Sequence, residues 1–172
     1  MGSDGTLIEV SDGTIVLPRR ERTRLIHMAR EMGFEVITEV GKKVSGAALN
    51  PREAAAVIRA DLAAGARKVV VEGRESGRGA GLYGPDGEIR TGDLEILLEQ
   101  VSDPGVLMWE APLKPQQEAW IRRFGPDVNL GNIPPGEVLA LEALRRGLRS
   151  DTLRLALQGE CDTIVVPEKP LL

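Results

Sequence analysis

Residue types that build many catalytic and metal sites are scarce in this sequence of 172 residues. It has one cysteine, Cys161, and one histidine, His27. These counts exclude an intramolecular disulfide, a cysteine-based zinc site, a histidine-dependent triad and an HExxH metal site. Aromatic residues make up only 3%, so we expect valine, leucine, isoleucine and alanine to fill the core.

Charge and hydrophobicity exclude two further classes of partner. The 22 basic and 26 acidic residues give a net charge of -4, which argues against bulk attraction to nucleic acid or anionic lipid. No apolar run approaches the roughly 20 residues that span a bilayer, and Gly-Ser-Asp-Gly after Met1 does not resemble a signal peptide. We therefore expect a cytoplasmic protein with neither nucleic-acid nor membrane partners.

Short β-branched runs alternate with longer stretches of helical period along most of the chain. Proline and asparagine stand where helices would begin, and glycine stands where they would end. We expect Asp93 to cap the third helix and Val138, Leu141, Leu144 and Leu148 to face inward from the fifth. The pattern predicts strands at 7–10, 34–40, 68–72, 106–110 and 128–130, and helices at 18–32, 51–64, 94–101, 115–124, 134–148 and 152–157.

Repeated βα units indicate an α/β fold with a parallel sheet and helices outside it. Two architectures fit this pattern, an open doubly wound sheet and part of a (β/α)8 barrel, and periodicity does not decide between them. Both place ligands at the carboxyl ends of the strands. We expect one domain over residues 1–158 and an irregular tail over 159–172.

Glutamate recurs at the ends of the first four predicted strands. Because parallel strands end at one edge of a sheet, these carboxylates can converge there and hold a hard divalent cation such as Mg²⁺. Side chains of alternate strands fill alternate layers of a barrel, so not all four can point inward at one depth. The four are Glu9, Glu39, Glu72 and Glu110.

Lysines and amides accompany these glutamates. Lys42 and Lys43 follow the second strand, where partial burial would lower the pKa of a lysine enough to make it an acid or a base. Asn129 and Asn132 follow at the fifth strand. The strand ends therefore form a candidate mixed-charge site for an anionic substrate.

Six blocks in order closely resemble the phosphosulfolactate synthase family, the (β/α)8-barrel enzymes of the coenzyme M pathway that add sulfite to phosphoenolpyruvate. The resemblance extends from Leu7 to about Leu153. It implies a Mg²⁺-dependent carbon–sulfur lyase that forms (2R)-2-O-phospho-3-sulfolactate. The blocks are Ile8–Thr14, Thr38–Lys43, Val71–Gly77, Glu110–Gln117, Val128–Ile133 and Leu144–Thr152.

The resemblance also implies a role for each matching residue. Lys43 corresponds to the proton donor, and its replacement by alanine is expected to abolish turnover while sparing substrate binding. Glu39, Glu72 and Glu110 would coordinate Mg²⁺ or support its ligands. The residues expected to contact the phosphate and sulfonate groups are Arg74, Ser76, Lys114, Arg146 and Arg149, and those expected to give neutral hydrogen bonds are Gln116, Gln117, Asn129 and Asn132.

A barrel of this type takes about 250 residues, whereas the five βα units here resemble the fourth to the eighth. Five parallel strands cannot close an eight-stranded barrel, so we expect a partial or open barrel with an unpaired edge at its first strand. Either a second copy completes or covers the barrel, or the chain is a fragment of a longer product, from a misplaced start codon or a truncated gene.

Two other functions fit the same fold. One is a non-catalytic role, because the family is similar to plant heat-stress-associated proteins; an inactive fragment of the fold belongs with this alternative. The other is a barrel lyase or aldolase that forms a Schiff base through Lys42 or Lys43. Borohydride trapping would support the Schiff base, and Mg²⁺-dependent consumption of sulfite would support the synthase.

Overall fold

A single parallel sheet organises the molecule, whose computed structural model describes residues 5–11, 13–43 and 48–160. Its strands follow one another in sequence order and pair only in parallel. This confirms the predicted α/β class. The strands are β1 (Leu7–Val10), β2 (Glu35–Val40), β3 (Lys68–Val71), β4 (Leu107–Glu110) and β5 (Leu130–Gly131).

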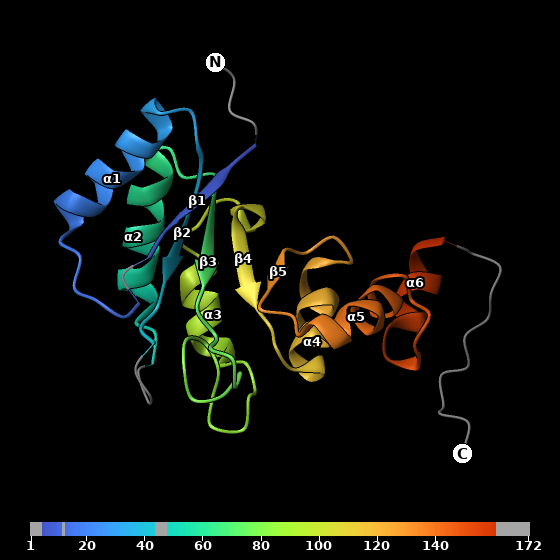
Figure 1. The fold of residues 1–172 in the computed structure, drawn as a ribbon. Helices are drawn as coiled ribbons and strands as arrows, with labels where there is room; N and C mark the ends of the chain where they lie inside the picture. Colours follow the sequence, from blue (N-terminus) through green and yellow to red (C-terminus); the bar gives the residue numbers. More distant parts are fainter. Residues whose placement is uncertain (1–4, 12, 44–47, 161–172) are drawn as a thin grey trace.

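A helix follows each strand. Figure 1 shows α1 and α2 side by side along the sheet, with α4, α5 and α6 grouped beyond β5. Asn50 caps α2 by accepting hydrogen bonds from the main chain of Arg52 and Glu53, as its sequence predicts. The helices are α1 (Arg19–Glu31), α2 (Pro51–Ala63), α3 (Thr91–Leu98), α4 (Lys114–Phe124), α5 (Val138–Arg145) and α6 (Ser150–Glu160), with 3₁₀ turns η1 (Pro104–Val106) and η2 (Pro135–Glu137).

The strand order favours one of the two predicted architectures. Right-handed crossovers between consecutive parallel strands place successive helices on the same side of a sheet. A doubly wound sheet reverses its order at a switch point, and β1-β2-β3-β4-β5 contains no reversal among the described strands. The order is that of a (β/α)8 barrel, in which one face of the sheet points to the barrel interior.

The two faces of the sheet differ in chemistry because side chains alternate along each strand. Val69, Val71 and Leu107 belong to the core between the sheet and the helices. The glutamates near the strand ends belong to the opposite face of the sheet. The core also contains the stacked rings of Trp109 and Trp120, with centroids 4.3 Å apart, so aliphatic residues alone do not fill it as expected.

Two sequence predictions for the starts of elements are wrong. Arg90, not Asp93, is the N-cap of α3, and Asp93 instead forms an ion pair with Arg90 at 3.0 Å. Strand β5 begins two residues later than predicted, because the Asn129 side chain donates hydrogen bonds to the main-chain oxygens of Gly105 and Leu107 just before the strand starts. Val128 lies outside β5 but belongs to the hydrophobic core and is 9% exposed.

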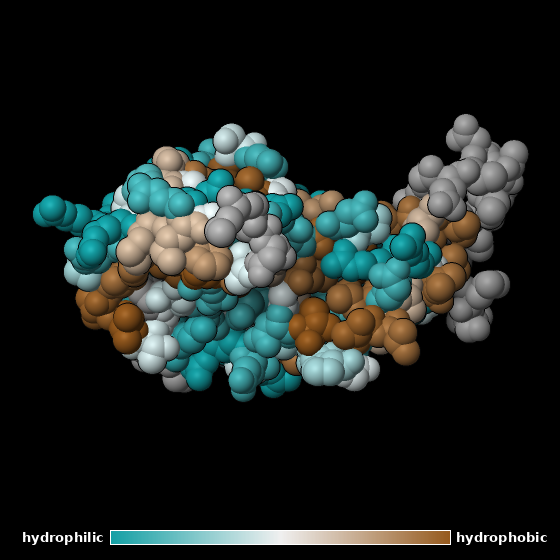
Figure 2. Space-filling model, turned by 45° about the horizontal axis from the view of Figure 1, so that its top comes forward, coloured by the Kyte–Doolittle hydropathy of each residue, from teal (hydrophilic) through white to brown (hydrophobic). Residues whose placement is uncertain are grey.

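The fifth helix is also shorter than predicted. It ends at Arg145, and Gly147, with φ +66°, turns the chain into α6. Leu148 lies beyond this turn and is 78% exposed, and Val138 at the other end of α5 is 54% exposed, so only Leu141 and Leu144 face inward. Hydrophobic surface gathers over this end of the molecule (Figure 2).

The predicted boundary at residue 158 falls inside α6, which continues to Glu160. The rest of the predicted tail, 161–172, lies outside the described residues. Among the described helices, none combines the length and the apolar composition needed to cross a bilayer.

Candidate active site

Three glutamates meet at the carboxyl edge of the sheet. Glu39 lies on β2, Glu72 directly follows β3, and Glu110 ends β4. One carboxylate oxygen from each lies within 4.8 Å of the others. Glu39 and Glu72 are 3% and 2% exposed, and Glu110 is half-buried. Three acidic side chains, separated by more than 30 residues along the sequence, therefore form one cluster, of which two members are buried and one is half-buried.

Main-chain amides hold two of these carboxylates. Gly73 N and Arg74 N donate to Glu110 Oε2 at 2.8 and 3.0 Å, and Arg74 N also lies 2.7 Å from Glu72 Oε1. Arg74 has φ +62°, a left-handed conformation that costs a non-glycine residue on the order of 1–3 kcal/mol. The turn after β3 thus carries backbone strain at the point where it binds both carboxylates.

Glycine allows the close approach of the other two loops. Gly41 has φ +117°, and a Cβ there would lie 2.5 Å from Glu72 Cβ. A Cβ at Gly13 would lie 2.8 Å from Glu39 Oε1. Ser11 Oγ donates to that same Glu39 oxygen at 2.8 Å. The loop after β2 therefore approaches Glu72 this closely only with glycine at position 41, whereas a side chain at Gly13 would require the Glu39 and Lys43 side chains to shift.

Lys43 is the cation closest to the cluster in the described ion pairs. Its Nζ lies 3.1 Å from Glu39 Oε2 and 3.6 Å from Glu72 Oε2, and its side chain is 44% exposed. Burial lowers the pKa of Lys43, but the hydrogen bond to Glu39 and the negative charges of all three glutamates outweigh it. The pKa is therefore raised, which corrects the expectation of a lowered value and keeps the amine protonated.

Glu72 has the most perturbed carboxylate. Burial raises its pKa to about 7, with further contributions from the charges of Glu110 and Glu39. Its Oε2 atom is buried and accepts no hydrogen bond from the described residues. A buried carboxylate oxygen without a hydrogen-bond donor is costly, and the Lys43 amine at 3.6 Å offsets only part of that cost.

The donor set fits a hard divalent cation. Mg²⁺ binds oxygen ligands at about 2.0–2.1 Å in octahedral geometry, so ligand oxygens lie roughly 3–4 Å apart. Three oxygens within 4.8 Å reach this arrangement with small side-chain adjustments. Glu72 Oε2 accepts no hydrogen bond from the described residues and lies 3.6 Å from Lys43 Nζ, so it offers a ligand atom. Glu39, Glu72 and Glu110 are thus the residues that could hold such an ion.

A buried ion pair between Arg22 and Asp61 contacts the main chain of Glu39. Arg22 donates through Nε and Nη2 to the Asp61 carboxylate at 2.7–3.0 Å, and through Nη2 to the main-chain oxygen of Glu39 at 2.8 Å. The two side chains are 5% and 3% exposed. Neither residue was predicted from the sequence as part of the site. The available signal was a charged residue on an otherwise apolar helix stripe, Arg22 with Ile26 on α1 and Asp61 with Ile58 on α2.

A pocket of about 570 Å³ opens beside the cluster. Three of the predicted substrate-binding residues, Arg74, Ser76 and Asn132, line it. Asn132 has φ +54° and directly follows β5, so it lies at the carboxyl edge of the sheet. The remaining lining residues are Lys43, Glu72, Glu75 and Glu110.

The predicted amide donors have other partners. Gln116 donates to the main-chain oxygens of Gly77 and Gly87, and Gln117 donates to that of Ala111. Both glutamines are 2% exposed or less. Asn129 lies at the opposite end of its strand, as described above. These three side chains hold the backbone of the loops and strands around the site.

Two of the predicted cations, Lys114 at the start of α4 and Arg149 just before α6, form a separate group. Lys114 Nζ lies 2.6 Å from Asp151 Oδ2, and Arg149 Nε lies 3.7 Å from the same atom. Lys114 lowers the pKa of Asp151 through this hydrogen bond, against a smaller opposing effect of burial. Asp151 was not predicted as a site residue, because nothing in its local sequence indicates that α6 approaches the start of α4.

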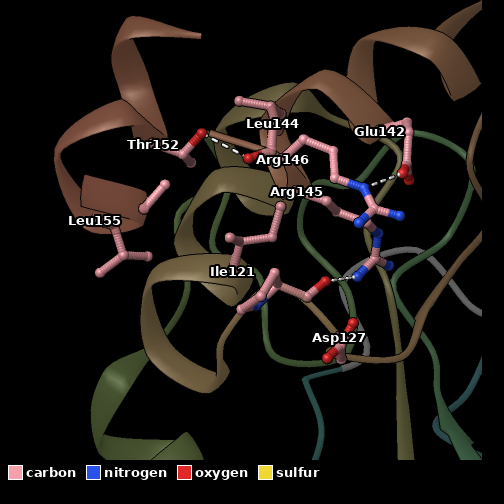
Figure 3. A pocket seen from close by; sticks show the side chains of 10 residues that line it. Ile121, Asp127, Glu142, Leu144, Arg145, Arg146, Thr152 and Leu155 are labelled. Atoms are coloured by element: carbon pink, nitrogen blue, oxygen red, sulfur yellow. Dashed lines mark hydrogen bonds and ion pairs between the residues drawn. The ribbon is translucent and has the colours of Figure 1, made fainter. Parts of the chain in front are cut away.

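Arg146 lies elsewhere. It pairs with Glu142 at 2.7 Å and lines a pocket of about 440 Å³ between α4, α5 and α6 (Figure 3). Leu144 and Leu155 line the apolar part of this pocket. None of the three clustered glutamates contributes to it.

The fold and the site together define a class of protein. A sheet wound in one direction, with an acidic site and a lysine at the carboxyl edge of its strands, is the arrangement of (β/α)-barrel proteins, whose ligand sites lie at that edge.

Comparison with known proteins gives the family. Residues 3–151 match the family model of (2R)-phospho-3-sulfolactate synthase (ComA). Two archaeal proteins named phosphosulfolactate synthase are similar to the chain. The one from Methanothermobacter thermautotrophicus is 47% identical over 148 residues, and the one from Methanocaldococcus jannaschii is 45% identical over 147. The chain belongs to the phosphosulfolactate synthase family.

A bacterial relative gives the same result. The phosphosulfolactate synthase of Bacillus subtilis is 39% identical over 150 residues. The three alignments cover 84–86% of this chain but only 57–59% of the relatives. The chain therefore spans somewhat less than three fifths of the length of the curated relatives it matches.

Proposed function

We propose that the chain carries the catalytic edge of a phosphosulfolactate synthase, which adds sulfite to phosphoenolpyruvate and forms (2R)-2-O-phospho-3-sulfolactate. The convergence of Lys43 and three glutamates beside one pocket supports this proposal most directly. In the reaction, the sulfur of sulfite bonds to the methylene carbon, and the carbon bearing the phosphate ester receives a proton. The finer assignment to a Mg²⁺-dependent lyase in the cytoplasm is part of the same proposal.

Glu39, Glu72 and Glu110 would hold the magnesium ion. When bound, Mg²⁺ supplies positive charge beside the substrate carboxylate, where negative charge develops, and such stabilisation contributes several kcal/mol. In the metal-free protein, the same three carboxylates raise the pKa of Lys43. Arg74 N, by holding Glu72 and Glu110 together, keeps two of the ligands at a fixed separation.

Lys43 is the proposed proton donor. A raised pKa leaves its amine charged at neutral pH, which is the form that can protonate a carbanion-like carbon. The same property disfavours the Schiff-base alternative, because a protonated amine is not a nucleophile. A positioned general acid accelerates proton transfer by roughly 10²–10⁴-fold.

Cations and amides around the pocket would bind the anionic groups. Arg74, Ser76 and Asn132 line the pocket itself, and we propose them as phosphate or sulfonate contacts. Lys114 and Arg149 would contact the same anionic groups after their ion pairs with Asp151 break. Gln116, Gln117 and Asn129 act through the backbone that they hold, and Arg146 is proposed only as part of the surrounding positive charge.

The relatives are longer, so we further propose that other parallel strands complete the barrel interior. A second copy of the chain or residues of a longer product can supply them. Sedimentation of the purified chain, alone and mixed with the separately expressed remainder of a relative, distinguishes the two sources. Self-association of the chain alone supports the first, and association only in the mixture supports the second.

Product formation tests the proposal. The chain, phosphoenolpyruvate, sulfite and Mg²⁺ are mixed, and ³¹P NMR follows conversion of phosphoenolpyruvate to a phosphosulfolactate resonance. Conversion that stops on chelation and in Glu72→Gln supports the assignment. Product formation that continues unchanged in Glu72→Gln contradicts the role of the carboxylate cluster. Absence of conversion with the barrel-completing segment present contradicts the proposed activity.

A further inference from the structure

Tyr83, in the loop between β3 and α3, joins the carboxylate cluster to the core. Its side chain is 2% exposed, and its hydroxyl lies 2.5 Å from the main-chain oxygen of Glu110. Trp120 Nε1 lies 2.8 Å from the same hydroxyl. Because an indole nitrogen only donates and a carbonyl oxygen only accepts, the direction is fixed: Trp120 donates to Tyr83, and Tyr83 donates to Glu110.

The tyrosine ring also lies against the turn that holds the Glu110 carboxylate. A Cβ at Gly73 would lie 2.7 Å from Tyr83 Cε2 and 2.8 Å from Glu110 O. Gly73 N donates to Glu110 Oε2, as does the next amide. One loop therefore contacts Glu110 at both ends, through a hydroxyl at its carbonyl and through two amides at its carboxylate.

The hydrogen bond from Tyr83 to the Glu110 main chain matters because β4 forms few contacts with β5, its neighbour at the edge of the sheet. Its neighbour β5 has two residues, and the two strands pair only at Trp109 and Glu110. Burial raises the pKa of Tyr83 above its ordinary value, although the hydrogen bond from Trp120 opposes this and Glu110 adds to it. The hydroxyl thus stays protonated and remains a donor at neutral pH.

We propose that Tyr83 is a positioning residue for the carboxylate site: its hydrogen bond to the Glu110 main chain fixes the end of β4, so that the Glu110 carboxylate faces Glu39 and Glu72. The consequence for metal binding rests on the proposed function, whereas the positioning itself does not. Tyr83 acts through Glu110 and touches no substrate.

The test compares Tyr83→Phe with Thr152→Val. Both substitutions remove one buried hydroxyl that donates to a main-chain oxygen. The Thr152 hydroxyl donates to the main-chain oxygen of Leu144 at 2.6 Å, and this hydrogen bond is remote from the carboxylate cluster. In metal-free protein, amide hydrogen exchange of Gly73 and Arg74 is expected to be about 3- to 10-fold faster in Tyr83→Phe and unchanged in Thr152→Val. The Kd for Mg²⁺ by calorimetry is expected to rise by a similar factor in Tyr83→Phe alone.

The outcomes separate the inference from the proposed function. Equal exchange of the two amides in wild type and Tyr83→Phe overturns the positioning role, whatever the Mg²⁺ affinity. Faster exchange in a protein whose wild type binds no Mg²⁺ supports the positioning role and removes the proposed metal site. Equal loss of Mg²⁺ affinity in both variants shows a general effect of stability and also overturns the inference.

A second measurement avoids the risk that Tyr83→Phe does not fold. Tyr83 is the single tyrosine of the sequence, so incorporation of 3-fluorotyrosine labels this position alone. Its ¹⁹F resonance is expected to shift on titration with Mg²⁺ in the otherwise unaltered protein and to stay constant in Glu110→Gln. A resonance that does not move while calorimetry shows binding overturns the inference.

Discussion

Lys43 Nζ lies 3.1 Å from Glu39 Oε2, four residues earlier in the chain. Glu39 is on β2 and Lys43 follows the turn at Gly41, so the chain folds back over the end of its own strand. The glycine permits this reversal, and the buried carboxylate keeps the exposed amine charged. Lys43 and Glu39, one of the three clustered glutamates, therefore belong to one short segment, whereas Glu72 and Glu110 come from the next two strands.

Replacing Lys43 by alanine is expected to reduce turnover by roughly 10²–10⁴-fold, because the proposed proton donor is lost. Lys42→Ala is the matched control, since Lys42 directs its amine to the Ile15 carbonyl oxygen at 3.5 Å instead. Product formation is followed by ³¹P NMR, and substrate binding is measured separately by calorimetry. Equal turnover in the two variants would remove the proposed role of Lys43.

Glu72 makes stability depend on pH. Its pKa is raised to about 7 in the folded state, against 4.5 for the ordinary value. The stabilisation is complete below about pH 4.5 and is lost as pH rises to about 7, because the unfolded state releases its proton first. We expect the loss to be on the order of 1–3 kcal/mol.

Urea denaturation of metal-free wild type and Glu72→Gln between pH 4 and pH 8 measures this effect. The difference in free energy of unfolding between the two proteins is expected to change through this window and to be constant above it. A difference that does not vary with pH would show that Glu72 titrates normally in the fold.

The buried pair of Arg22 and Asp61 gives a prediction for stability. Removing one partner leaves an uncompensated buried charge, so Arg22→Met is expected to cost about 3–5 kcal/mol. The double variant Arg22→Met with Asp61→Leu is expected to recover most of that loss. Urea denaturation measures both. A double variant that is no more stable than Arg22→Met would contradict this account of the pair.

Gly41→Ala tests the close approach of the β2 loop to Glu72. Positive φ and the 2.5 Å contact with Glu72 Cβ predict a loss of about 1–3 kcal/mol in stability. Gly92→Ala is the control, because a methyl group on this helical glycine would meet no atom within 4 Å and the residue has an ordinary φ. The control is expected to gain about 0.5–1 kcal/mol. Similar thermal shifts in both variants would argue against the packing described here.

Local sequence patterns predicted most of the fold because strands and helices here have clean periodicity. Asn50 and Pro51 set the start of α2, and the run Val69–Val71 forms a strand buried on both faces, as parallel sheets require. The predictions were wrong where tertiary contacts decide the outcome. Hydrogen bonds of the Asn129 side chain make β5 begin later than predicted, and the turn at Gly147 leaves Leu148 exposed to solvent.

The site could be predicted in part for the same reason. Parallel strands bring residues at their carboxyl ends together, so Glu39, Glu72 and Glu110 could be grouped without coordinates. Tyr83 and Asp151 could not, because a long glycine-rich loop and a terminal helix have no period that fixes where they pack. Their contacts with Glu110 and Lys114 arise only from the folded chain.

Calorimetric titration of Mg²⁺ into wild type, Glu39→Gln, Glu72→Gln and Glu110→Gln tests the central claim most directly. One site is expected in the wild type, and each substitution is expected to weaken binding by at least about tenfold, because all three carboxylates would share one ion. Binding of equal affinity in the wild type and all three variants would contradict a common site at this edge of the sheet.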